Sequence, residues 1–176
     1  MKSTPEQLSE LCLACGMCCD GTLFGKAHIK DADEFDRLKA LGMSTFYEDA
    51  NASFTQPCPQ YNGSCKMYRT APSVCSNYYC LPLRKLKRGA ASLAETEKTI
   101  RQAGSLKRQF LDTCPKTPEF SGKSIFEIKQ YLNMKERPLP EQIQMRKEHA
   151  QLYPLGLKLQ LLLIGDEGKK KEMANK

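Results

Sequence analysis

The chain has 176 residues, with 27 Lys and Arg against 20 Asp and Glu, 9 Cys, 2 His and no Trp. This length suits one domain, or one domain with an appendage, and an apolar content of 40% allows a modest core, so wholesale disorder is not expected. The cysteine content is below the ~8–10% of a small secreted disulfide scaffold, and the odd number would leave one thiol without a disulfide partner.

The N-terminal residues, Met1 to Glu6, contain no apolar run of the kind a secretory signal needs. The longest apolar stretch, Leu155 to Ile164, is interrupted by Lys158 and Gln160 and is too short to span a membrane. We therefore expect a cytoplasmic protein without a membrane partner. In a reducing cytosol, clustered cysteines bind metals or serve catalysis more often than they form disulfides.

A short helix is predicted at the N-terminus, because Thr4 can cap it, Pro5 suits its first position and Gln7 stands at the capping-box position. This helix would end at Cys12. Residues 22–29 are compatible with a short strand.

Asp31 or Asp33 can cap a second helix that runs to Leu41. Prolines and an Asn-Gly step predict a loop over residues 57–63, and a further helix is expected from Pro72 to near Pro82.

The remaining chain has the apolar periodicity of helices over residues 92–111, 124–134 and 140–152. Leucine at every second position over residues 155–161 favours a strand, with a helix as the alternative. The fold class predicted is mainly α, with irregular metal-stapled loops and a short β-hairpin; a small α+β fold is the alternative.

Eight cysteines form two groups, and charge divides the chain at nearly the same place. Residues 1–80 contain 7 Lys and Arg and 9 Asp and Glu, whereas residues 81–176 contain 20 and 11. We interpret residues 1–90 as a cysteine-cluster metal-binding domain, residues 91–164 as a basic helical segment packing on it, and residues 165–176 as a disordered basic tail.

Overlapping Cys-x-x-Cys steps in the first group indicate a metal site, since two thiolates at this spacing can converge on one ion. Gly16 suits the turn between them, because it tolerates positive φ. The adjacent pair Cys18 and Cys19 predicts either two neighbouring four-ligand centres or one polynuclear cluster. The candidate ligands are Cys12, Cys15, Cys18, Cys19, Cys58, Cys65, Cys75 and Cys80.

These eight cysteines, with Pro59 after Cys58 and with Tyr68 and Pro72 after Cys65, resemble the CxxCxxCC family of zinc- or iron-chelating proteins, the YkgJ-like cysteine-cluster proteins. The resemblance covers about the first 80 residues and implies metal chelation through these cysteines. The family pattern usually has Arg where this chain has Ala71 and Ser76. Such cations would offset thiolate charge, and Arg69 is the nearest substitute in the sequence.

All-sulfur ligation suits both zinc and an iron–sulfur cluster. The Cys-Pro steps at Cys58 and Cys114 resemble ferredoxin ligation, whereas Cys19 follows Cys18 too closely for the ferredoxin spacing, so both cofactors stay open. Cys114 itself is interpreted as incidental. The two histidines, His28 and His149, are interpreted as ordinary surface or strand residues, with a ligand or proton-carrying function for His28 as the alternative.

The function predicted is a metal-binding cysteine-cluster protein with a structural or metal-handling role. No Gly-rich phosphate loop, Ser-His-Asp arrangement or paired catalytic carboxylates can be recognised, so the question of an enzyme stays open. An iron–sulfur oxidoreductase or protein-modification enzyme is one alternative. The second is a basic adaptor for nucleic acid or protein, for which the run Arg84 to Arg88 is the densest cationic segment.

Overall fold

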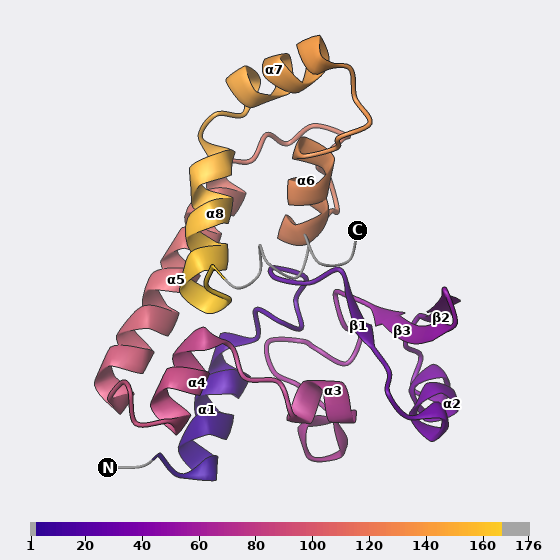
Figure 1. Cartoon of the computed structure of the whole chain (residues 1–176), viewed down its shortest axis with the longest axis vertical. Helices are drawn as coiled ribbons and strands as arrows, with labels where there is room; N and C mark the ends of the chain where they lie inside the picture. Colours follow the sequence, from indigo (N-terminus) through magenta and orange to yellow (C-terminus); the bar gives the residue numbers. More distant parts are fainter. Residues whose placement is uncertain (1–2, 167–176) are drawn as a thin grey trace. The chain divides into compact units, whose positions relative to one another are not determined.

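The computed structural model describes residues 3–166 of the chain. Within them, helices dominate and a small antiparallel sheet is present, which confirms the mainly α fold class (Figure 1). The elements are α1 (Pro5–Cys15), β1 (Lys26–His28), α2 (Ala32–Ala40), β2 (Thr45–Glu48), β3 (Asn51–Thr55), a 3-10 turn η1 (Tyr68–Thr70), α3 (Ser73–Ser76), α4 (Leu81–Lys87), α5 (Leu93–Thr113), α6 (Ile125–Leu132), α7 (Leu139–Glu148) and α8 (Leu152–Leu163).

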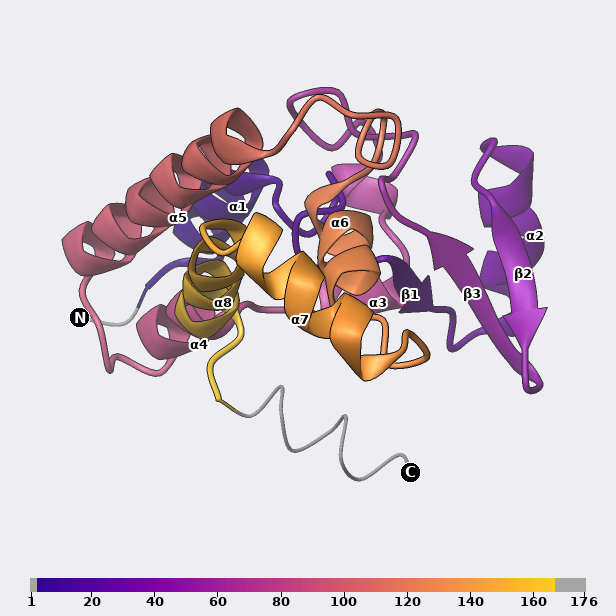
Figure 2. The same ribbon diagram turned by 90° about the horizontal axis from the view of Figure 1, so that it is seen from above.

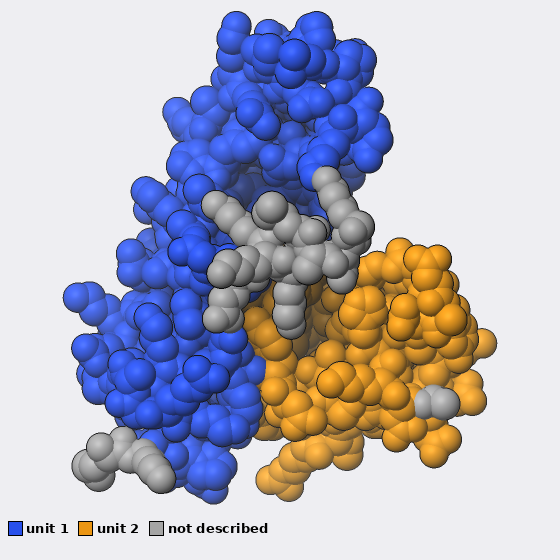
Figure 3. All heavy atoms as spheres, in the orientation of Figure 1, with its two compact units in different colours: residues 1–11, 79–176 blue, residues 12–78 orange. Residues whose placement is uncertain are grey.

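The described residues divide into two compact units, which Figure 3 colours separately. Residues 12–78, here called the cysteine unit, contain the sheet with α2 and α3. Residues 3–11 and 79–166, here called the helical unit, contain α4 to α8. Helix α1 crosses the boundary, since its first seven residues belong to the helical unit and its last turn belongs to the cysteine unit.

The cysteine unit is built on three short strands in the order β1-β3-β2, with both pairs antiparallel (Figure 2). Asp49 and Ala50 adopt positive φ and form the tight turn of the β2–β3 hairpin. Only Lys26–His28 of the predicted 22–29 strand pairs with β3. Helix α2 packs on β2 and β3. The buried core residues of this unit are Ile29, Leu38, Met43, Phe54, Cys58 and Met67.

The helical unit is centred on α5 and α8, which run side by side (Figure 1, Figure 2). Reciprocal capping boxes start α5, where Ser92 pairs with Glu95, and α6, where Ser124 pairs with Glu127. Phe110 of α5 is completely buried, and the α8 side chains turned inward are Leu152, Leu159 and Leu163.

Two predicted elements are wrong. The strand expected over residues 155–161 is wrong, because these residues lie in α8, whose buried positions follow helical spacings of three and four. The helix expected to run from Pro72 to near Pro82 is also wrong. Helix α3 ends at Ser76, and α4 begins at Leu81 with Pro82 in its first turn, where proline fits.

The first helix has the predicted start but not the predicted end. Thr4 and Gln7 exchange hydrogen bonds as a capping box, and the helix continues past Cys12 to Cys15. The second helix is capped by Asp31, as predicted. The tail expected to be disordered lies outside the described residues from position 167 onward.

Candidate metal centre

The first cysteine loop follows directly from the end of α1. Gly16, with a φ of +62°, reverses the chain after Cys15, and its backbone N–H donates to the Cys12 carbonyl at 3.1 Å. The Cys19 backbone N–H donates in turn to the Gly16 carbonyl at 2.8 Å. Cys12 and Cys15 therefore lie on the last helical turn, and Cys18 and Cys19 lie in the tight turn that follows it.

The second cysteine segment is hydrogen-bonded to the first. The Cys58 backbone N–H donates to the Cys19 carbonyl at 2.7 Å, so the two loops meet at their backbones. Tyr61 donates its backbone N–H to the Cys58 carbonyl and forms a β-bridge with Cys65. Cys58 is buried in the core of the unit, against which Cys19, Cys65 and Cys75 also pack. Short-range turns and core packing thus gather thiols that are distant in sequence.

Helix α2 supplies the polar contacts that position Cys75. The Glu34 carboxylate accepts hydrogen bonds from the backbone N–H and the hydroxyl of Ser73, at 2.8 and 3.2 Å, and so caps α3. The Arg37 guanidinium donates to the Thr70 carbonyl at 2.8 Å. Arg37, which is itself exposed, is therefore a cation held beside this segment by a hydrogen bond.

The thiols of the first loop are in a setting that opposes ionisation. Burial raises the pKa of Cys12, and the nearby Cys15 and Cys65 thiols raise it further. Burial likewise raises the pKa of Cys19 far above its ordinary value, with additional contributions from Cys65, Cys75, Cys58 and Cys12. Each thiolate would repel its neighbours in a poorly solvated site, so the protonated forms are favoured when no cation is bound.

The second segment shows the same electrostatics. Burial raises the pKa of Cys75 to about 12, with further contributions from Cys58, Cys65, Cys12 and Glu34. Burial also raises the pKa of Cys58, although a hydrogen bond from the Gln60 backbone acts in the opposite direction. Backbone N–H groups aimed at sulfur are a common feature of metal–thiolate loops.

Electrostatic interactions thus connect six of the eight predicted ligands in the cysteine unit, with Cys15 connected through Cys12: Cys12, Cys15, Cys19, Cys58, Cys65 and Cys75. Cys18 is half-buried in the same first loop. Cys80 belongs to the helical unit, where it is 6% exposed and occupies the N-cap of α4. All nine cysteines are thiols rather than disulfides.

The thiols fit a thiophilic metal by their chemistry, because soft sulfur donors select zinc and iron–sulfur clusters. Among residues 3–166, no group of three or more His, Cys, Asp or Glu side chains is already arranged to hold a metal ion. The fit thus rests on the donor type and on the mutual electrostatic effects of the thiols.

The residues interpreted as incidental have ordinary structural contacts. His28 is exposed on β1, and its Nδ1 lies 3.0 Å from the Ser53 hydroxyl. His149 ends α7 and packs edge-to-face on Phe120, with ring centroids 5.1 Å apart. Cys114 forms the C-cap of α5 in the helical unit.

The basic run on α4 is partly engaged within the helical unit. Arg84 donates to the Ile164 carbonyl at 3.2 Å, and the Lys87 ammonium lies 4.2 Å from the centre of the Tyr79 ring. Lys85 and Arg88 are exposed. Two of the four cations thus take part in the packing of α4.

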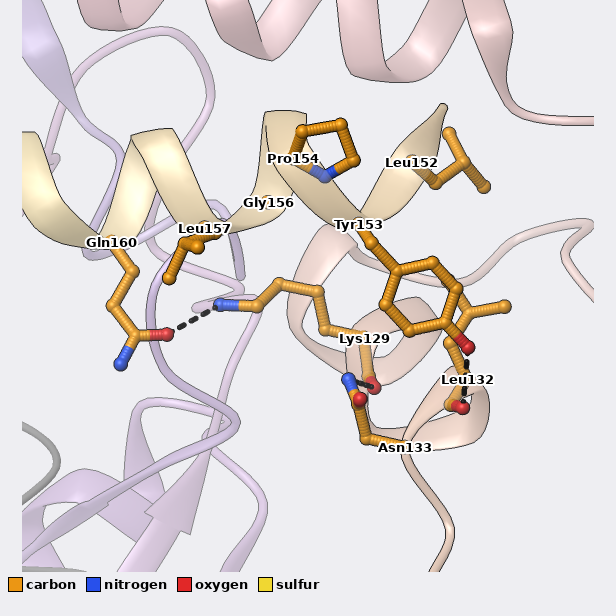
Figure 4. Close-up of a pocket in the computed structure, with 9 residues that line it drawn as sticks. All are labelled: Lys129, Leu132, Asn133, Leu152, Tyr153, Pro154, Gly156, Leu157 and Gln160. Atoms are coloured by element: carbon orange, nitrogen blue, oxygen red, sulfur yellow. Dashed lines mark hydrogen bonds between the residues drawn. The ribbon is translucent and has the colours of Figure 1, made fainter. Parts of the chain in front are cut away.

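A cavity of about 440 Å³ lies between α6 and α8 of the helical unit (Figure 4). Lys129 extends past Gly156, where a Cβ would come within 3.3 Å of its side chain, and its ammonium donates to Gln160 at 3.3 Å. The Tyr153 hydroxyl donates to the Leu132 carbonyl at 2.9 Å. No cysteine lines this cavity, so the thiol chemistry does not extend to it.

Sequence reasoning missed three residues at the cysteine site: Tyr61, Glu34 and Arg37. Tyr61 follows Cys58 by three residues beside the predicted Asn-Gly turn, which was the available signal. The contacts of Glu34 and Arg37 span 39 and 33 residues and leave no local pattern.

The thiol-rich unit defines this chain as a cysteine-cluster protein. It belongs to the CxxCxxCC family, whose model is described as a putative zinc- or iron-chelating domain and matches residues 11–109. Searches of the curated proteins and of the solved structures found no significant match. Within the part of the chain that the structure describes, no helix is both long and apolar enough to cross a membrane.

Proposed function

We propose that this protein folds around a metal–thiolate centre, either zinc or an iron–sulfur cluster, and that the centre has a structural or metal-handling role. The ligands are drawn from Cys12, Cys15, Cys18, Cys19, Cys58, Cys65, Cys75 and Cys80. The observation that carries the proposal is that buried thiols of both loops, Cys12, Cys19, Cys58 and Cys75, have pKa values raised by burial and by neighbouring cysteines of the same unit. Membership of a zinc- or iron-chelating family supports the same class of ligand.

The electrostatics explain why a metal would stabilise this unit. Thiols whose pKa is raised by burial and by neighbouring thiols lose their protons at a cost, which a divalent cation or an iron–sulfur core repays by direct bonding to sulfur. Because an unfolded chain holds no preformed site, this binding energy becomes folding energy, on the order of 10 kcal/mol for a structural zinc.

A closed, structural type of site is supported by the packing around Cys58. Its side chain is 8% exposed and lies in the same core as Leu38 and Phe54, which are fully buried. Structural metal sites are typically closed to water, whereas catalytic sites keep an open position.

The decisive experiment is purification under anaerobic, reducing conditions followed by metal and acid-labile sulfide analysis. Stoichiometric zinc in a colourless protein, or iron with sulfide in a brown protein, supports the proposal and identifies the cofactor. A folded protein that contains neither metal, and that takes up neither on reconstitution, overturns it.

Single substitutions then test the ligand set. Cys19→Ser and Cys75→Ser are expected to lower the bound metal per chain, because each removes a half-buried sulfur donor. Cys114→Ser is the matched control, since this thiol lies outside the proposed set, and it should retain the wild-type metal content. Equal metal content in all three variants would contradict the assignment.

A further inference from the structure

Tyr61 closes the contact between the two cysteine loops by packing on Gly16. A Cβ on Gly16 would overlap the Oη, Cζ and Cε2 atoms of Tyr61, so the phenol occupies the space of a side chain at this position. Gly42 and Gly63 also have positive φ, at +76°, but a Cβ on either would meet nothing within 4 Å. The requirement for glycine at position 16 is therefore due to Tyr61 as well as to the backbone turn.

Three backbone hydrogen bonds lead from Gly16 back to Tyr61. Cys19 donates to Gly16 at 2.8 Å, Cys58 donates to Cys19 at 2.7 Å, and Tyr61 donates to Cys58 at 3.0 Å. The contact of the phenol with Gly16 closes this path into a circuit of contacts. This circuit includes two proposed ligands, Cys19 from the first loop and Cys58 from the second. A displacement of Tyr61 would therefore change how the two loops approach each other.

The Tyr61 hydroxyl lies against Gly16, the residue that follows Cys15. Burial raises its pKa, and Asp20, Cys19 and Cys15 add to the shift. A phenol hydroxyl can donate a hydrogen bond, and a metal-bound thiolate can accept one.

We propose that Tyr61 is a positioning residue of the metal centre: its ring clamps the Gly16 turn, and its hydroxyl donates a hydrogen bond to a metal-bound thiolate of Cys15 or Cys19. This inference rests on the proposed metal-binding function. Hydrogen bonds to ligand sulfur withdraw electron density from it, and partners of this kind typically change metal affinity by about 10- to 100-fold.

The hydroxyl is tested with Tyr61→Phe, and with Tyr47→Phe as the control, because Tyr47 is 63% exposed and belongs to the same unit. Tyr61→Phe should lower Zn²⁺ affinity, measured by chelator competition, by roughly 10-fold. With Co²⁺ as the spectroscopic probe, its sulfur-to-metal charge-transfer band should move to longer wavelength. Tyr47→Phe should match the wild type. An unchanged affinity and spectrum in Tyr61→Phe overturns the hydrogen bond.

The clamp is tested by comparing Gly16→Ala with Gly42→Ala. Both variants place a Cβ at a positive φ, but only the first displaces Tyr61. Gly16→Ala should therefore lower Zn²⁺ affinity at least about 10-fold more than Gly42→Ala does. Equal losses overturn the clamp.

A measurement on metal-free protein separates this inference from the proposed function. If the wild type binds neither Zn²⁺ nor Co²⁺, the metal centre and the hydrogen bond to it are both refuted. The clamp is then decided by denaturant unfolding. A lower midpoint for Gly16→Ala than for Gly42→Ala supports it, and equal midpoints overturn it.

Discussion

The helical unit and the cysteine unit are stabilised by different means. In the helical unit, long helices bury apolar side chains almost completely: Phe110 and Ala103 have no exposed surface, and Leu159 and Leu163 have 1%. In the cysteine unit, the strands have three to five residues, and three of the six core side chains contain sulfur: Met43, Cys58 and Met67.

This difference shows what each unit needs in order to fold. Apolar burial and two capping boxes account for the helical unit without any ligand. A unit of the size and short elements of residues 12–78 is marginal by burial alone, and such units are commonly completed by disulfides or metals. On the proposed function, a metal bound by its thiols would be the element that completes this unit.

Metal removal should therefore destabilise the cysteine unit and leave the helical unit folded, and this is the largest effect we expect. Treatment with a chelator under reducing conditions should sharply lower amide hydrogen-exchange protection in β3 and around Cys58, to the residual level that the metal-free fold supports. Protection in α5 and α8 should persist, because the free energy lost, on the order of 10 kcal/mol, belongs to the cysteine unit. Equal loss of protection in both units would refute this difference between them. As a control, reloading with metal should restore the protection.

The reverse perturbation is Phe110→Ala. Phe110 is fully buried in the helical unit, so its truncation should cost about 3–5 kcal/mol in the free energy of unfolding, through lost burial and the cavity left behind. Chemical denaturation followed by circular dichroism measures the loss. Metal content per chain should stay at the wild-type value while the protein is folded. Phe126→Ala, on a half-buried side chain of α6, should cost less and serves as the control.

The two units also differed in how far their structure could be predicted from sequence. Apolar periodicity was sufficient to place α5 and α6, and the structure adds Ser92 and Ser124 as their caps. Helix α8 was mistaken for a strand, because its outward leucines, Leu157 and Leu161, fill the positions that would otherwise be polar and so imitate alternation. Leucine is compatible with a strand and with a helix, and packing against α5 stabilises the helix.

At the candidate site, the sequence indicated the cysteine ligands but not the residues that position them. The spacing of the cysteines marked them as a set, since local turns bring Cys12 and Cys15 onto one helical turn. Glu34 and Tyr61 act across the fold, and contacts of this kind depend on how loops meet rather than on any local periodicity. The assignment of the eight ligands stays a prediction.

The stability of the two units should also differ in its pH dependence, although this effect is smaller. A thiol whose pKa is raised in the folded state favours folding below its unfolded pKa of 9.0, and this stabilisation is lost as the pH rises towards the folded value. Metal-free protein should thus lose stability above pH 9, with about 1 kcal/mol lost between pH 9 and 10 for Cys75, whose folded pKa is about 12.

Hydrogen exchange at pH 8 to 10, corrected for intrinsic rates, would locate this loss in the cysteine unit. Metal-loaded protein should behave in the opposite way at lower pH, since protons compete with metal for sulfur and its stability falls as the pH decreases. A metal-free cysteine unit that gains stability between pH 9 and 10 would contradict the raised pKa values.

The smallest expected effect concerns α1, which starts in the helical unit and ends on Cys12 and Cys15. Thr4→Ala removes its capping box and should cost about 1 kcal/mol, and Ser92→Ala should cost α5 a similar amount. Only Thr4→Ala loosens the helix that presents two proposed ligands. It should therefore lower Zn²⁺ affinity up to about 5-fold, the equivalent of 1 kcal/mol, whereas Ser92→Ala should leave the affinity unchanged. If both variants lower the Zn²⁺ affinity equally, the expected difference between the two units is refuted. The affinity would then depend on the stability of the whole chain rather than on α1.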